Sequence, residues 1–276
     1  MPDQTLIRAA CIQLNSGADQ NINLARVASL IEEAAEQDCE LLLLPENFSF
    51  MGADEADKLA IAEKQKDSAV LAFLADQARE YGIVIVGGSV PLKSDHSDKI
   101  RNSCPVFSPA GECIACYDKI HLFDVDLPDE HYCESESIKA GRLPEHVSFD
   151  GWNIGLSICY DLRFPELYRH YSSLGCNILT VPAAFTVPTG QAHWETLLRA
   201  RAIENQAYVL AAGQCGTHPN GRKTWGHSMM INPWGEVIAS FENEVENREG
   251  IIVADFSLNN LNKIRQTMPV LDHRRL

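Results

Sequence analysis

The sequence predicts an α/β fold that forms one domain over residues 1–276. Apolar, strand-like runs alternate along the chain with segments whose apolar residues recur every three or four positions, which is the spacing of an amphipathic helix. Several strand-like runs are apolar at every position, so they need helices or a second sheet as cover. No Ser/Gly-rich linker, low-complexity tract or change in composition marks a domain boundary. A chain of this length buries roughly three quarters of its unfolded surface, which is enough for one large core.

In the first half of the chain, helix and strand patterns follow one another closely. Residues 21–37 predict a helix, because their apolar residues fall on one face. These residues are Leu24, Val27, Ala28, Ile31, Ala34 and Ala35. The run "CELLLLP" (39–45) predicts a strand that is buried on both faces. Residues 68–82 predict a second helix, and residues 83–90 a second strand.

The second half repeats the alternation and adds two hairpins. The predicted elements are, in order, helix 165–175, strand 176–182, helix 191–206 and strand 207–215. Residues 102–118 and 228–241 each hold two strand-like runs around a Pro/Gly turn, which is typical of a β-hairpin. The charged stretch "FENEVENREG" (241–250) predicts a solvated turn.

Composition argues against several kinds of partner. The chain has 23 Lys and Arg residues against 38 Asp and Glu residues, a net charge of −15, and no basic run longer than "HRR" near the C-terminus. This opposes nucleic-acid binding, which needs clustered positive charge. The first residues lack a basic region followed by a long apolar core, and "ELLLLP" is too short to span a bilayer. We therefore expect a cytoplasmic protein with no membrane partner.

Nine cysteines raise the question of disulfides and metal sites. An odd number in a chain this long and apolar favours reduced thiols. Cys113 and Cys116 form a C-x-x-C motif, but the sequence holds no second such motif to complete a zinc site. The pair lies in a predicted hairpin strand, where a separation of three sends side chains to opposite faces. We therefore interpret these two cysteines as packing residues.

Cys159 stands in a different context, at the end of the predicted strand in "GWNIGLSICYDLRFPELYR" (151–169). Pro165 favours the start of a helix just after it, and Glu166 complements the positive end of that helix. A side chain at such a strand-to-helix turn lies where α/β folds bind their ligands. A free thiol is only a few per cent ionised at neutral pH, so a nucleophilic Cys159 needs a base from elsewhere in the chain.

Three charged residues are candidates for that chemistry. Glu46 follows four leucines at the end of a predicted strand, where partial desolvation is expected to raise its pKa and to suit it as a general base. Lys119 ends a predicted hairpin strand, and Glu134 lies further on, in "HYCESES". Taken alone, Glu46 could cap the next segment, Lys119 could be a surface lysine and Glu134 a loop carboxylate.

Taken together, these segments carry a family resemblance. The segments "LLLLPENF", "YDKIHLFDVDLP" and "LSICYDLRFPELYR" resemble the three signature segments of the nitrilase, or carbon–nitrogen hydrolase, superfamily, in the family's order of Glu, Lys and Cys. The segments "AHWETLLRARAIENQAYV", "WGHSMMINPWGEVIA" and "IRQTMPVLDHRR" extend the likeness over nearly the whole chain. The resemblance implies a four-layer αββα sandwich that packs sheet to sheet with a second copy, and hence a homodimer or larger homo-oligomer.

Carried over to this sequence, the family pattern assigns the reacting groups. It makes Cys159 the nucleophile, Glu46 the general base and Lys119 the cation that faces the tetrahedral oxyanion. The backbone N–H of Tyr160 is the implied second oxyanion donor. We predict no metal or organic cofactor for this chemistry.

The family's second glutamate matches Glu134 through its "CES" context. With Glu46, it would hold the compact ammonium group of Lys119 in place. The loop between Lys119 and Glu134 is one residue shorter than in the family pattern, so Glu136 is the alternative.

Within the family, the deaminated glutathione amidase branch is the nearest by resemblance. The segments "PAAFTVPTGQAHWETLLRARAIENQ", "AAGQCG" and "TWGHSM" carry this likeness. The enzymes of that branch cleave the α-keto analogue of glutathione to 2-oxoglutarate and Cys-Gly. The ω-amidase branch, which hydrolyses 2-oxoglutaramate, shares "AHWE" and "WGHS" and is the alternative, followed by other aliphatic amidases and N-carbamoyl hydrolases.

Both substrates carry carboxylates, so an acidic protein must supply a local cation. Arg163 is the candidate, because its planar guanidinium group can hold a carboxylate through two parallel hydrogen bonds. By resemblance, Phe185 and Thr189 line the same pocket. Arg163 could instead pair with Asp161 or Glu166, and Phe185 could serve packing alone.

Two other functions fit the sequence less well. His193 raises the possibility of a papain-like Cys–His pair, but no histidine has a context as specific as those of Glu46 and Lys119. On the same predicted helix, Glu195 and Arg199 form a favourable i, i+4 pair, which indicates a structural segment. A non-catalytic scaffold would be expected to lose a catalytic residue, and all three are present. We therefore predict a cysteine-dependent amidase that works through an acyl-enzyme thioester.

Overall fold

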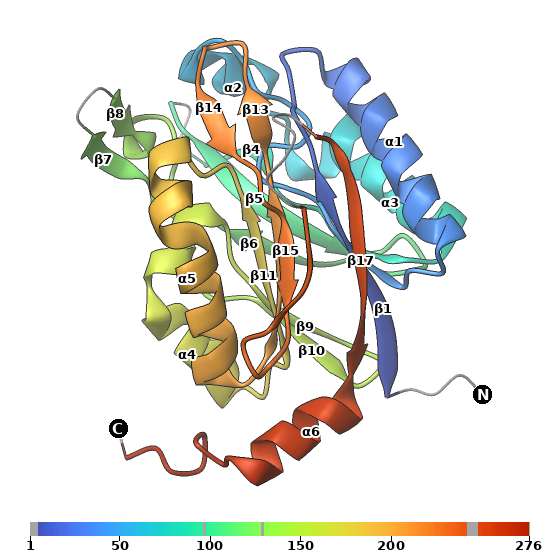
Figure 1. Cartoon of the computed structure of the whole chain (residues 1–276). Coiled ribbons are helices and arrows are strands. Elements are labelled where there is room, and N and C mark those ends of the chain that lie inside the picture. Colours follow the sequence, from blue (N-terminus) through green and yellow to red (C-terminus); the bar gives the residue numbers. More distant parts are fainter. Residues whose placement is uncertain (1–4, 96–97, 128–129, 242–247, 276) are drawn as a thin grey trace.

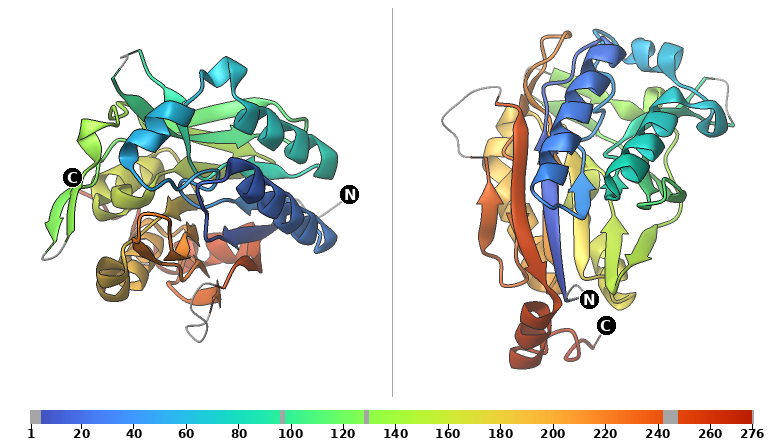
Figure 2. Two further views of the ribbon diagram at one scale, coloured as in Figure 1. Left: turned by 90° about the horizontal axis from the view of Figure 1, so that it is seen from above. Right: turned by 90° about the vertical axis from the view of Figure 1, so that its right-hand side faces the viewer.

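Two β-sheets face each other between two layers of helices in the computed structural model, which describes residues 5–95, 98–127, 130–241 and 248–275. The helices that form the outer layers are α1 (Gln20–Glu36) and α3 (Ala69–Tyr81) on one side and α4 (Pro165–Ser173) and α5 (Val187–Asn205) on the other. Figure 1 shows this arrangement, and the two views of Figure 2 show the same order of layers. The predicted α/β class and the four-layer αββα sandwich are therefore confirmed.

The first sheet carries the strand that precedes Glu46. In spatial order its strands are β17 (Gly250–Ser257), β1 (Leu6–Gln13), β2 (Leu41–Leu43), β3 (Val84–Val86), β5 (Ile100–Phe107) and β4 (Val90–Lys93), with β6 (Cys113–Asp118) also paired to β5. Strands β1, β2 and β3 are parallel, and β17 and β5 run antiparallel to them on either side. The predicted hairpin at 102–118 is present as β5 and β6.

The second sheet carries the strand that precedes Cys159. In spatial order its strands are β16 (Val237–Ser240), β15 (Met229–Ile231), β12 (Tyr208–Gly213), β11 (Ile178–Ala183), β10 (Trp152–Leu156) and β9 (His146–Phe149). Strands β10, β11 and β12 are parallel, and the predicted hairpin at 228–241 is present as β15 and β16.

Shorter elements connect and flank the sheets. They are the hairpins β7 (Asp124–Leu127) with β8 (Glu130–Cys133) and β13 (Cys215–Thr217) with β14 (Lys223–Trp225), the helices α2 (Glu55–Ile61) and α6 (Leu258–Thr267), and the 3-10 turns η1 (Gln65–Asp67), η2 (Glu134–Glu136) and η3 (Cys159–Arg163). No helix in the described part of the chain is long and apolar enough to cross a membrane.

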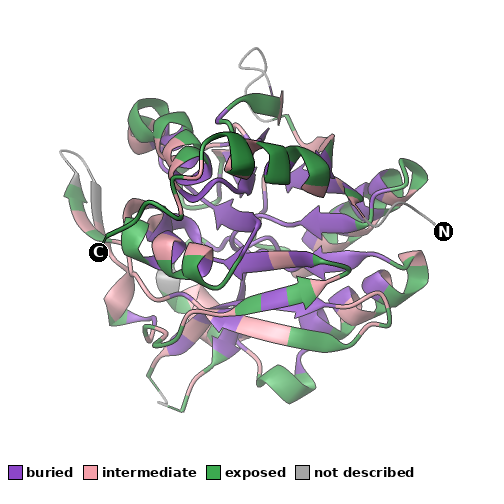
Figure 3. Cartoon of the chain, turned by 90° about the horizontal axis from the view of Figure 1, so that it is seen from below, coloured by how far each residue is buried: buried purple, intermediate pink, exposed green. Residues whose placement is uncertain are grey.

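The hydrophobic core lies between the sheets and under the helices. In β2, Leu41 and Leu43 join the cluster that faces the second sheet, while Leu42 between them joins the cluster under α1 and α3. This alternation follows from the two-residue period of a strand, and it explains why a strand buried on both faces is apolar at every position. Figure 3 shows buried residues along the central strands and exposed residues on the outer faces of the helices.

Local sequence signals set the helix ends. The side chain of Asp19 accepts hydrogen bonds from two first-turn N–H groups of α1, and Ser68 caps α3 in the same way. Gly82 ends α3 in the left-handed conformation, with a φ of 66°. The helix expected at 191–206 begins earlier, at Val187, because Pro188 in its first turn has no N–H group that needs a partner.

The strand expected over 83–90 is divided into two. Strand β3 ends at Val86 and β4 begins at Val90. Between them Gly88 has a φ of 55°, and a Cβ atom on it would lie 2.1 Å from the carbonyl oxygen of Pro45. Only glycine allows this close approach, so the turn packs directly against the residue that precedes Glu46. Of the solvated turn predicted at 241–250, residues 242–247 lie outside the described residues.

Each sheet has both of its faces covered within this chain. The first sheet packs on α1 and α3 and on the second sheet, and the second sheet packs in turn on α4 and α5. The sheet-to-sheet contact that we expected with a second copy is thus made inside one chain. Assembly into a homodimer or larger oligomer stays a prediction, and it would have to use other surfaces.

The C-x-x-C pair departs from the strand geometry expected of it. Cys113 lines a surface groove with Leu71 and Phe107, and Cys116 packs against the cluster that contains those two residues. Both thiols therefore lie on the α3 side of the sheet, and the expectation of opposite faces is wrong. The cause is a one-residue shift in the β5–β6 pairing at Phe107, which interrupts the alternation of side chains. Both cysteines are free.

Candidate active site

One pocket at the ends of the central strands brings all the predicted site residues together. Glu46 follows β2, Lys119 follows β6 and Cys159 follows β10, so three different strands deliver the three groups. The predicted residues that line the pocket are Glu46, Lys119, Glu134, Cys159, Tyr160, Arg163, Phe185 and Thr189. The close approach of these residues, which are distant in the sequence, follows from the facing of the two sheets.

Cys159 lies at a sharp turn between β10 and α4. Its φ is 50°, in the left-handed region that residues with a Cβ rarely adopt, and such a conformation costs about 1–3 kcal/mol. The 3-10 turn η3 begins at Cys159, and Pro165 then opens α4 as the sequence predicts. The side chain is 7% exposed and lines the pocket. The turn therefore presents the thiol to the pocket while keeping it nearly free of bulk water.

Glu46 is held by hydrogen bonds on both carboxylate oxygens. Oε1 accepts from the side-chain amide of Asn102 and from Nζ of Lys119, each at 3.0 Å. Oε2 accepts from the backbone N–H of Ala184 at 2.9 Å. The side-chain amide of Gln214 also donates to the carbonyl oxygen of Glu46, at 3.0 Å. These contacts fix the carboxylate in one orientation although it is almost fully buried.

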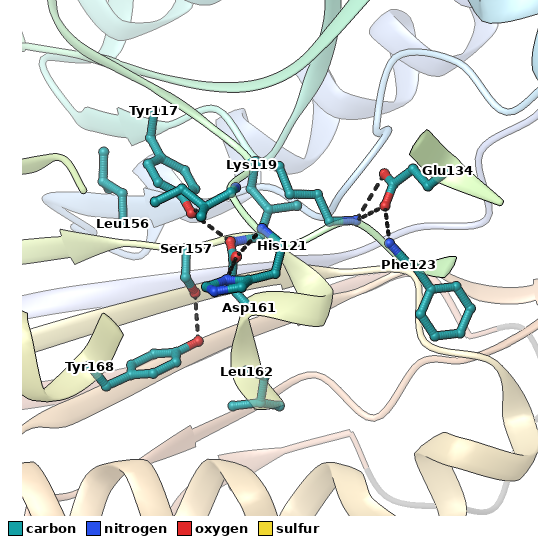
Figure 4. Close-up of polar contacts among 12 residues, drawn as sticks. Tyr117, Lys119, His121, Phe123, Glu134, Leu156, Ser157, Asp161, Leu162 and Tyr168 are labelled. Carbon is teal, nitrogen blue, oxygen red and sulfur yellow. Dashed lines mark hydrogen bonds and ion pairs between the residues drawn. The ribbon is translucent and has the colours of Figure 1, made fainter. Parts of the chain in front are cut away.

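Lys119 is paired with two carboxylates. Its Nζ atom lies 2.9 and 2.8 Å from the two oxygens of Glu134, in addition to its contact with Glu46. The backbone N–H of Phe123 donates to the same Glu134 carboxylate at 2.8 Å. Figure 4 shows Lys119 and Phe123 converging on Glu134. Glu136, the alternative second glutamate, is exposed and does not line the pocket.

The charges of this cluster follow from its burial and its pairing. Burial is the largest single effect on Glu46 and would raise its pKa. The charge of Lys119, hydrogen bonds from Cys159 and Lys119, and the charge of Arg222 together outweigh burial, so the pKa lies below its usual value. The raised pKa expected from the sequence is therefore wrong. Burial lowers the pKa of Lys119, but Glu134 and Glu46 more than reverse this effect, so the pKa lies well above its usual value.

The pKa of the Cys159 thiol is shifted upward, in the opposite direction to the pKa of Glu46. Burial, and then the negative charge of Glu46, raise the pKa of Cys159 far above that of a free thiol, against a lowering effect of Lys119. At neutral pH the cluster therefore contains a carboxylate, an ammonium group and an un-ionised thiol. This is the arrangement for a base that takes the thiol proton during attack rather than before it.

A buried carboxylate that sequence reasoning did not single out for this purpose joins the nucleophile turn to the lysine segment. Asp161 accepts hydrogen bonds from the hydroxyl of Tyr117 at 2.7 Å and from the backbone N–H of Ile158 at 2.8 Å. Its other oxygen lies 3.0 Å from the backbone nitrogen and 2.7 Å from Nδ1 of His121. Figure 4 shows Tyr117 and His121 around Asp161, with Lys119 extending away from them. Asp161 thus fixes the relative position of the two segments.

Arg163 lies over two aromatic rings at the pocket wall. Its guanidinium carbon is 5.7 Å from the ring centre of Tyr160 and 5.4 Å from that of Phe185. Its Nη1 lies 3.2 Å from Nδ1 of His193. Cation–π contacts of this kind hold a guanidinium group in place and leave its edge open to a ligand.

The alternatives weighed for this part of the site find no support in the geometry. Within the described ranges, no ion pair joins Arg163 to Asp161, whose carboxylate is fully buried among other donors, or to Glu166, which is exposed. His193 is exposed, bonds to Arg163 and is not among the residues that line the pocket. A Cys–His pair with His193 is therefore not formed. The Glu195–Arg199 pair is present at 3.2 Å.

Phe185 and Thr189 lie at the start of α5. Phe185 packs on Trp194, with ring centres 4.8 Å apart, and also lines the pocket, so it serves both packing and the pocket wall. The hydroxyl of Thr189 lies 2.8 Å from that of Thr186. Arg222, from the turn between β13 and β14, also lines the pocket. The sequence did not single out this residue. Among the described residues, no group of three or more His, Cys, Asp or Glu side chains is arranged to hold a metal ion.

Comparison with known proteins agrees with this site. The protein-family model for carbon-nitrogen hydrolase matches residues 8–266. The chain is 42% identical over 270 residues to the deaminated glutathione amidase of Synechocystis sp. (strain PCC 6803 / GT-S), covering 96% of this chain and 97% of that protein. It is 39% identical over 277 residues to omega-amidase NIT2 of Homo sapiens, covering 98% and 96%.

A solved structure gives the same result for the fold. The crystal structure of Saccharomyces cerevisiae Nit3, a member of branch 10 of the nitrilase superfamily, superposes with a TM-score of 0.88 at 30% identity. The match covers 99% of this chain and 97% of that one. The chain therefore belongs to the carbon–nitrogen hydrolase family, whose members hydrolyse carbon–nitrogen bonds other than peptide bonds, as its sequence segments predicted.

Proposed function

We propose that this hydrolase is a cysteine-dependent amidase that cleaves the amide of deaminated glutathione to 2-oxoglutarate and Cys-Gly. The observation that carries the proposal is the meeting of Cys159, Glu46 and Lys119 in one pocket, with the thiol un-ionised and the carboxylate and ammonium charged. The relative named deaminated glutathione amidase supports the choice of substrate.

In the first step the thiol attacks the amide carbon. The Sγ atom of Cys159 forms a bond to that carbon while its proton passes to the carboxylate of Glu46, and the carbonyl π electrons move to the oxygen. The carboxylate has a lowered pKa and the thiol a raised one, so proton transfer without a substrate is unfavourable. Proton transfer therefore accompanies attack, when the forming C–S bond makes the thiol more acidic.

The oxyanion formed in this step needs donors that already face it. Lys119 supplies a charged donor, and the backbone N–H of Tyr160, which pairs with no acceptor in the described part of the chain, supplies the second. Nζ of Lys119 contacts one oxygen of Glu46 and both oxygens of Glu134. A single N–H can bridge the two Glu134 oxygens, which leaves the third N–H of the ammonium group for the oxyanion. Donors fixed before the reaction stabilise such a state by about 3–4 kcal/mol each.

Collapse of the first intermediate releases the amine. The C–N bond breaks as the proton held by Glu46 passes to the leaving nitrogen, and a thioester of Cys159 remains. Water then attacks the thioester, giving its proton to Glu46, and the second oxyanion meets the same two donors. When the C–S bond breaks, the proton returns to sulfur and the carboxylic acid leaves. No metal or organic cofactor is needed in this sequence of steps.

In this proposal Arg163 binds the carboxylate of the 2-oxoglutaryl half. It lies over Tyr160, next to the nucleophile, and over Phe185, while Thr189 lines the pocket nearby. A planar guanidinium group with a free edge suits a planar carboxylate. The same placement would serve 2-oxoglutaramate, so omega-amidase activity is the second candidate, supported by the similarity to omega-amidase NIT2.

A direct assay tests the proposal. Purified protein is incubated with deaminated glutathione or with 2-oxoglutaramate, and 2-oxoglutarate release is followed for each. We expect turnover of deaminated glutathione at the higher kcat/KM. Failure to hydrolyse it would reject the first function, and preference for 2-oxoglutaramate would assign the second. If neither is cleaved, aliphatic amides and N-carbamoyl compounds are the next substrates to try.

We further propose that the enzyme is a single catalytic domain, works in the cytoplasm and forms a homodimer or larger homo-oligomer. Nine free cysteines suit a reducing compartment. A light-scattering mass equal to one chain would contradict the expected assembly.

A further inference from the structure

The pocket holds more positive charge than the catalytic steps require. The charged residues among those that line it are the cations Lys58, Lys119, Arg163 and Arg222 and the carboxylates Glu46 and Glu134. Both carboxylates are engaged by Lys119. Even with Lys58 left out of the count, the three other cations outnumber the two carboxylates, in a protein whose net charge is −15. Such a local excess in an acidic protein favours an anionic ligand.

Arg222 lines this pocket, and not all of its N–H donors have an acceptor within the described residues. Its Nη2 donates to the carbonyl oxygen of Ala184, and its guanidinium carbon lies 5.1 Å from the ring centre of Tyr132. Its Nε atom is buried and has no acceptor among the described residues, and no carboxylate within those ranges forms an ion pair with Arg222. The guanidinium charge of Arg222 thus lies at the pocket wall without a carboxylate partner, which favours an anionic group of a ligand as its counter-ion.

Arg163 and Arg222 contact the reacting centre through different residues. Arg163 lies over Tyr160, the residue after the nucleophile. Arg222 bonds to the carbonyl oxygen of Ala184, whose own N–H donates to Glu46. The positive charge of Arg222 also contributes to lowering the pKa of Glu46. Because Glu46 protonates the departing amine in the proposed reaction, an arginine linked to Glu46 through Ala184 suits the amine half of the substrate.

We propose that Arg222 determines specificity by binding a carboxylate on the amine half of the substrate, while Arg163 binds the carboxylate on the acyl half. The inference rests on the proposed function and deepens it. The substrate class it defines is a dianionic amide with a carboxylate at each end, such as a 2-oxoacyl dipeptide. It therefore favours deaminated glutathione over 2-oxoglutaramate, which releases ammonia and has no second carboxylate.

Two substrates that differ only at the far end of the amine half test this assignment. One is deaminated glutathione, and the other is the same compound with its C-terminal carboxylate converted to a carboxamide. The measured quantity is the preference, defined as kcat/KM for the acid divided by kcat/KM for the carboxamide. We expect the wild type to prefer the acid by roughly 10- to 100-fold, as a charge-assisted hydrogen bond allows.

Variants at the two arginines separate the two ends of the substrate. Arg222→Gln should lose most of the preference, and Arg222→Lys should keep part of it, because the charge remains but the planar fork is lost. Arg163→Gln is the matched control. It should lower kcat/KM for both substrates together and leave the preference intact, since both share the 2-oxoglutaryl carboxylate. A ratio is unaffected by a general loss of active protein.

The outcomes separate this inference from the proposed function. If the wild type cleaves both substrates with no preference, or if Arg222→Gln keeps the full preference, the role of Arg222 is refuted while the amidase function stands. Equal loss of preference in Arg163→Gln and Arg222→Gln would also refute it. If the wild type cleaves neither compound, the proposed function fails and the inference fails with it.

Discussion

Cys159 and the C-x-x-C pair at the start of β6 differ in what surrounds the sulfur. Burial is the largest cause of a raised pKa for Cys113, Cys116 and Cys159 alike, and it raises the pKa of Cys116 to about 12. The carboxylate near Cys116 is that of Asp118, which is already bonded to Arg101 and Ser103. Cys159 instead faces the Glu46–Lys119 pair inside the pocket. The acidity of the thiol therefore does not identify the nucleophile in this protein. The nucleophile is identified by the neighbouring groups that can receive the thiol proton and stabilise the negative charge formed in the reaction.

The largest expected effect separates the two regions through activity. Cys159→Ala should lower kcat by at least about 10⁴-fold, because it removes the atom that forms the thioester. Cys116→Ala, matched in residue type, should stay within about twofold of the wild type, because that thiol has no proposed role in the reaction. Release of 2-oxoglutarate measures both. Comparable losses of kcat in the two variants would contradict the assignment of Cys159 as the nucleophile.

A smaller effect is expected when the cation beside the thiol is removed. Lys119→Met should lower kcat by roughly 10²–10³-fold through loss of one oxyanion donor. It should also lower the free energy of unfolding by about 3–5 kcal/mol, because Glu46 and Glu134 would remain buried without their counter-ion.

The control for this substitution is Lys139→Met. Lys139 pairs at 3.4 Å with Asp95, whose side chain is 96% exposed, so its loss should cost at most about 1 kcal/mol and leave kcat unchanged. Chemical denaturation and the amidase assay give both values. Similar stability losses in the two lysine variants would contradict the account of the buried cluster.

The pH dependence of activity tests the charge states assigned to the cluster. The lowered pKa of Glu46 keeps it ionised as the pH falls, and the raised pKa values of Lys119 and Cys159 keep both protonated as the pH rises. We therefore expect kcat/KM to vary little between about pH 6 and pH 9. A Cys–His pair would instead make kcat/KM change steeply near the histidine pKa of about 6.5. A steep change in kcat/KM within this pH range would count against Glu46 as the general base.

The smallest expected effect concerns the backbone at the two cysteines. At Cys159, with its φ of 50°, Gly should be more stable than Ala by about 1 kcal/mol, because glycine adopts the left-handed region without strain. At Cys116, which lies beyond the bulge of β6 and pairs with Pro105, the order should reverse. Denaturant midpoints of the four variants measure the two differences. The same order at both positions would show that the turn at Cys159 is not strained.

Much of the fold was predictable because it rests on local signals. The helical spacing of residues 21–37 and the proline at 165 act within a few residues of themselves, and the structure keeps both of them. The expected alternation in β6 failed at Cys113, because a bulge depends on pairing with another strand. The division of 83–90 into two strands depends likewise on the loop that packs against Gly88.

The site was predictable where a residue has a distinctive sequence context and not where its role comes from its neighbours in space. Glu46 could be singled out after four leucines, but the direction of its pKa shift could not, because Lys119 is far away in the sequence. Arg222 lies in a turn rich in polar residues and looks like an ordinary surface arginine. Only the fold brings it beside Ala184 and into the pocket.

The central claim is that the Cys159 thiol forms a covalent acyl-enzyme with Glu46 as its base. Rapid acid quench of the enzyme with deaminated glutathione, followed by peptide mass analysis, tests it directly. The account predicts a mass increase of one 2-oxoglutaryl group on the peptide that contains Cys159, and none on the peptide that contains Cys113 and Cys116. An adduct on another residue, or full turnover by Cys159→Ala with no adduct, would contradict it.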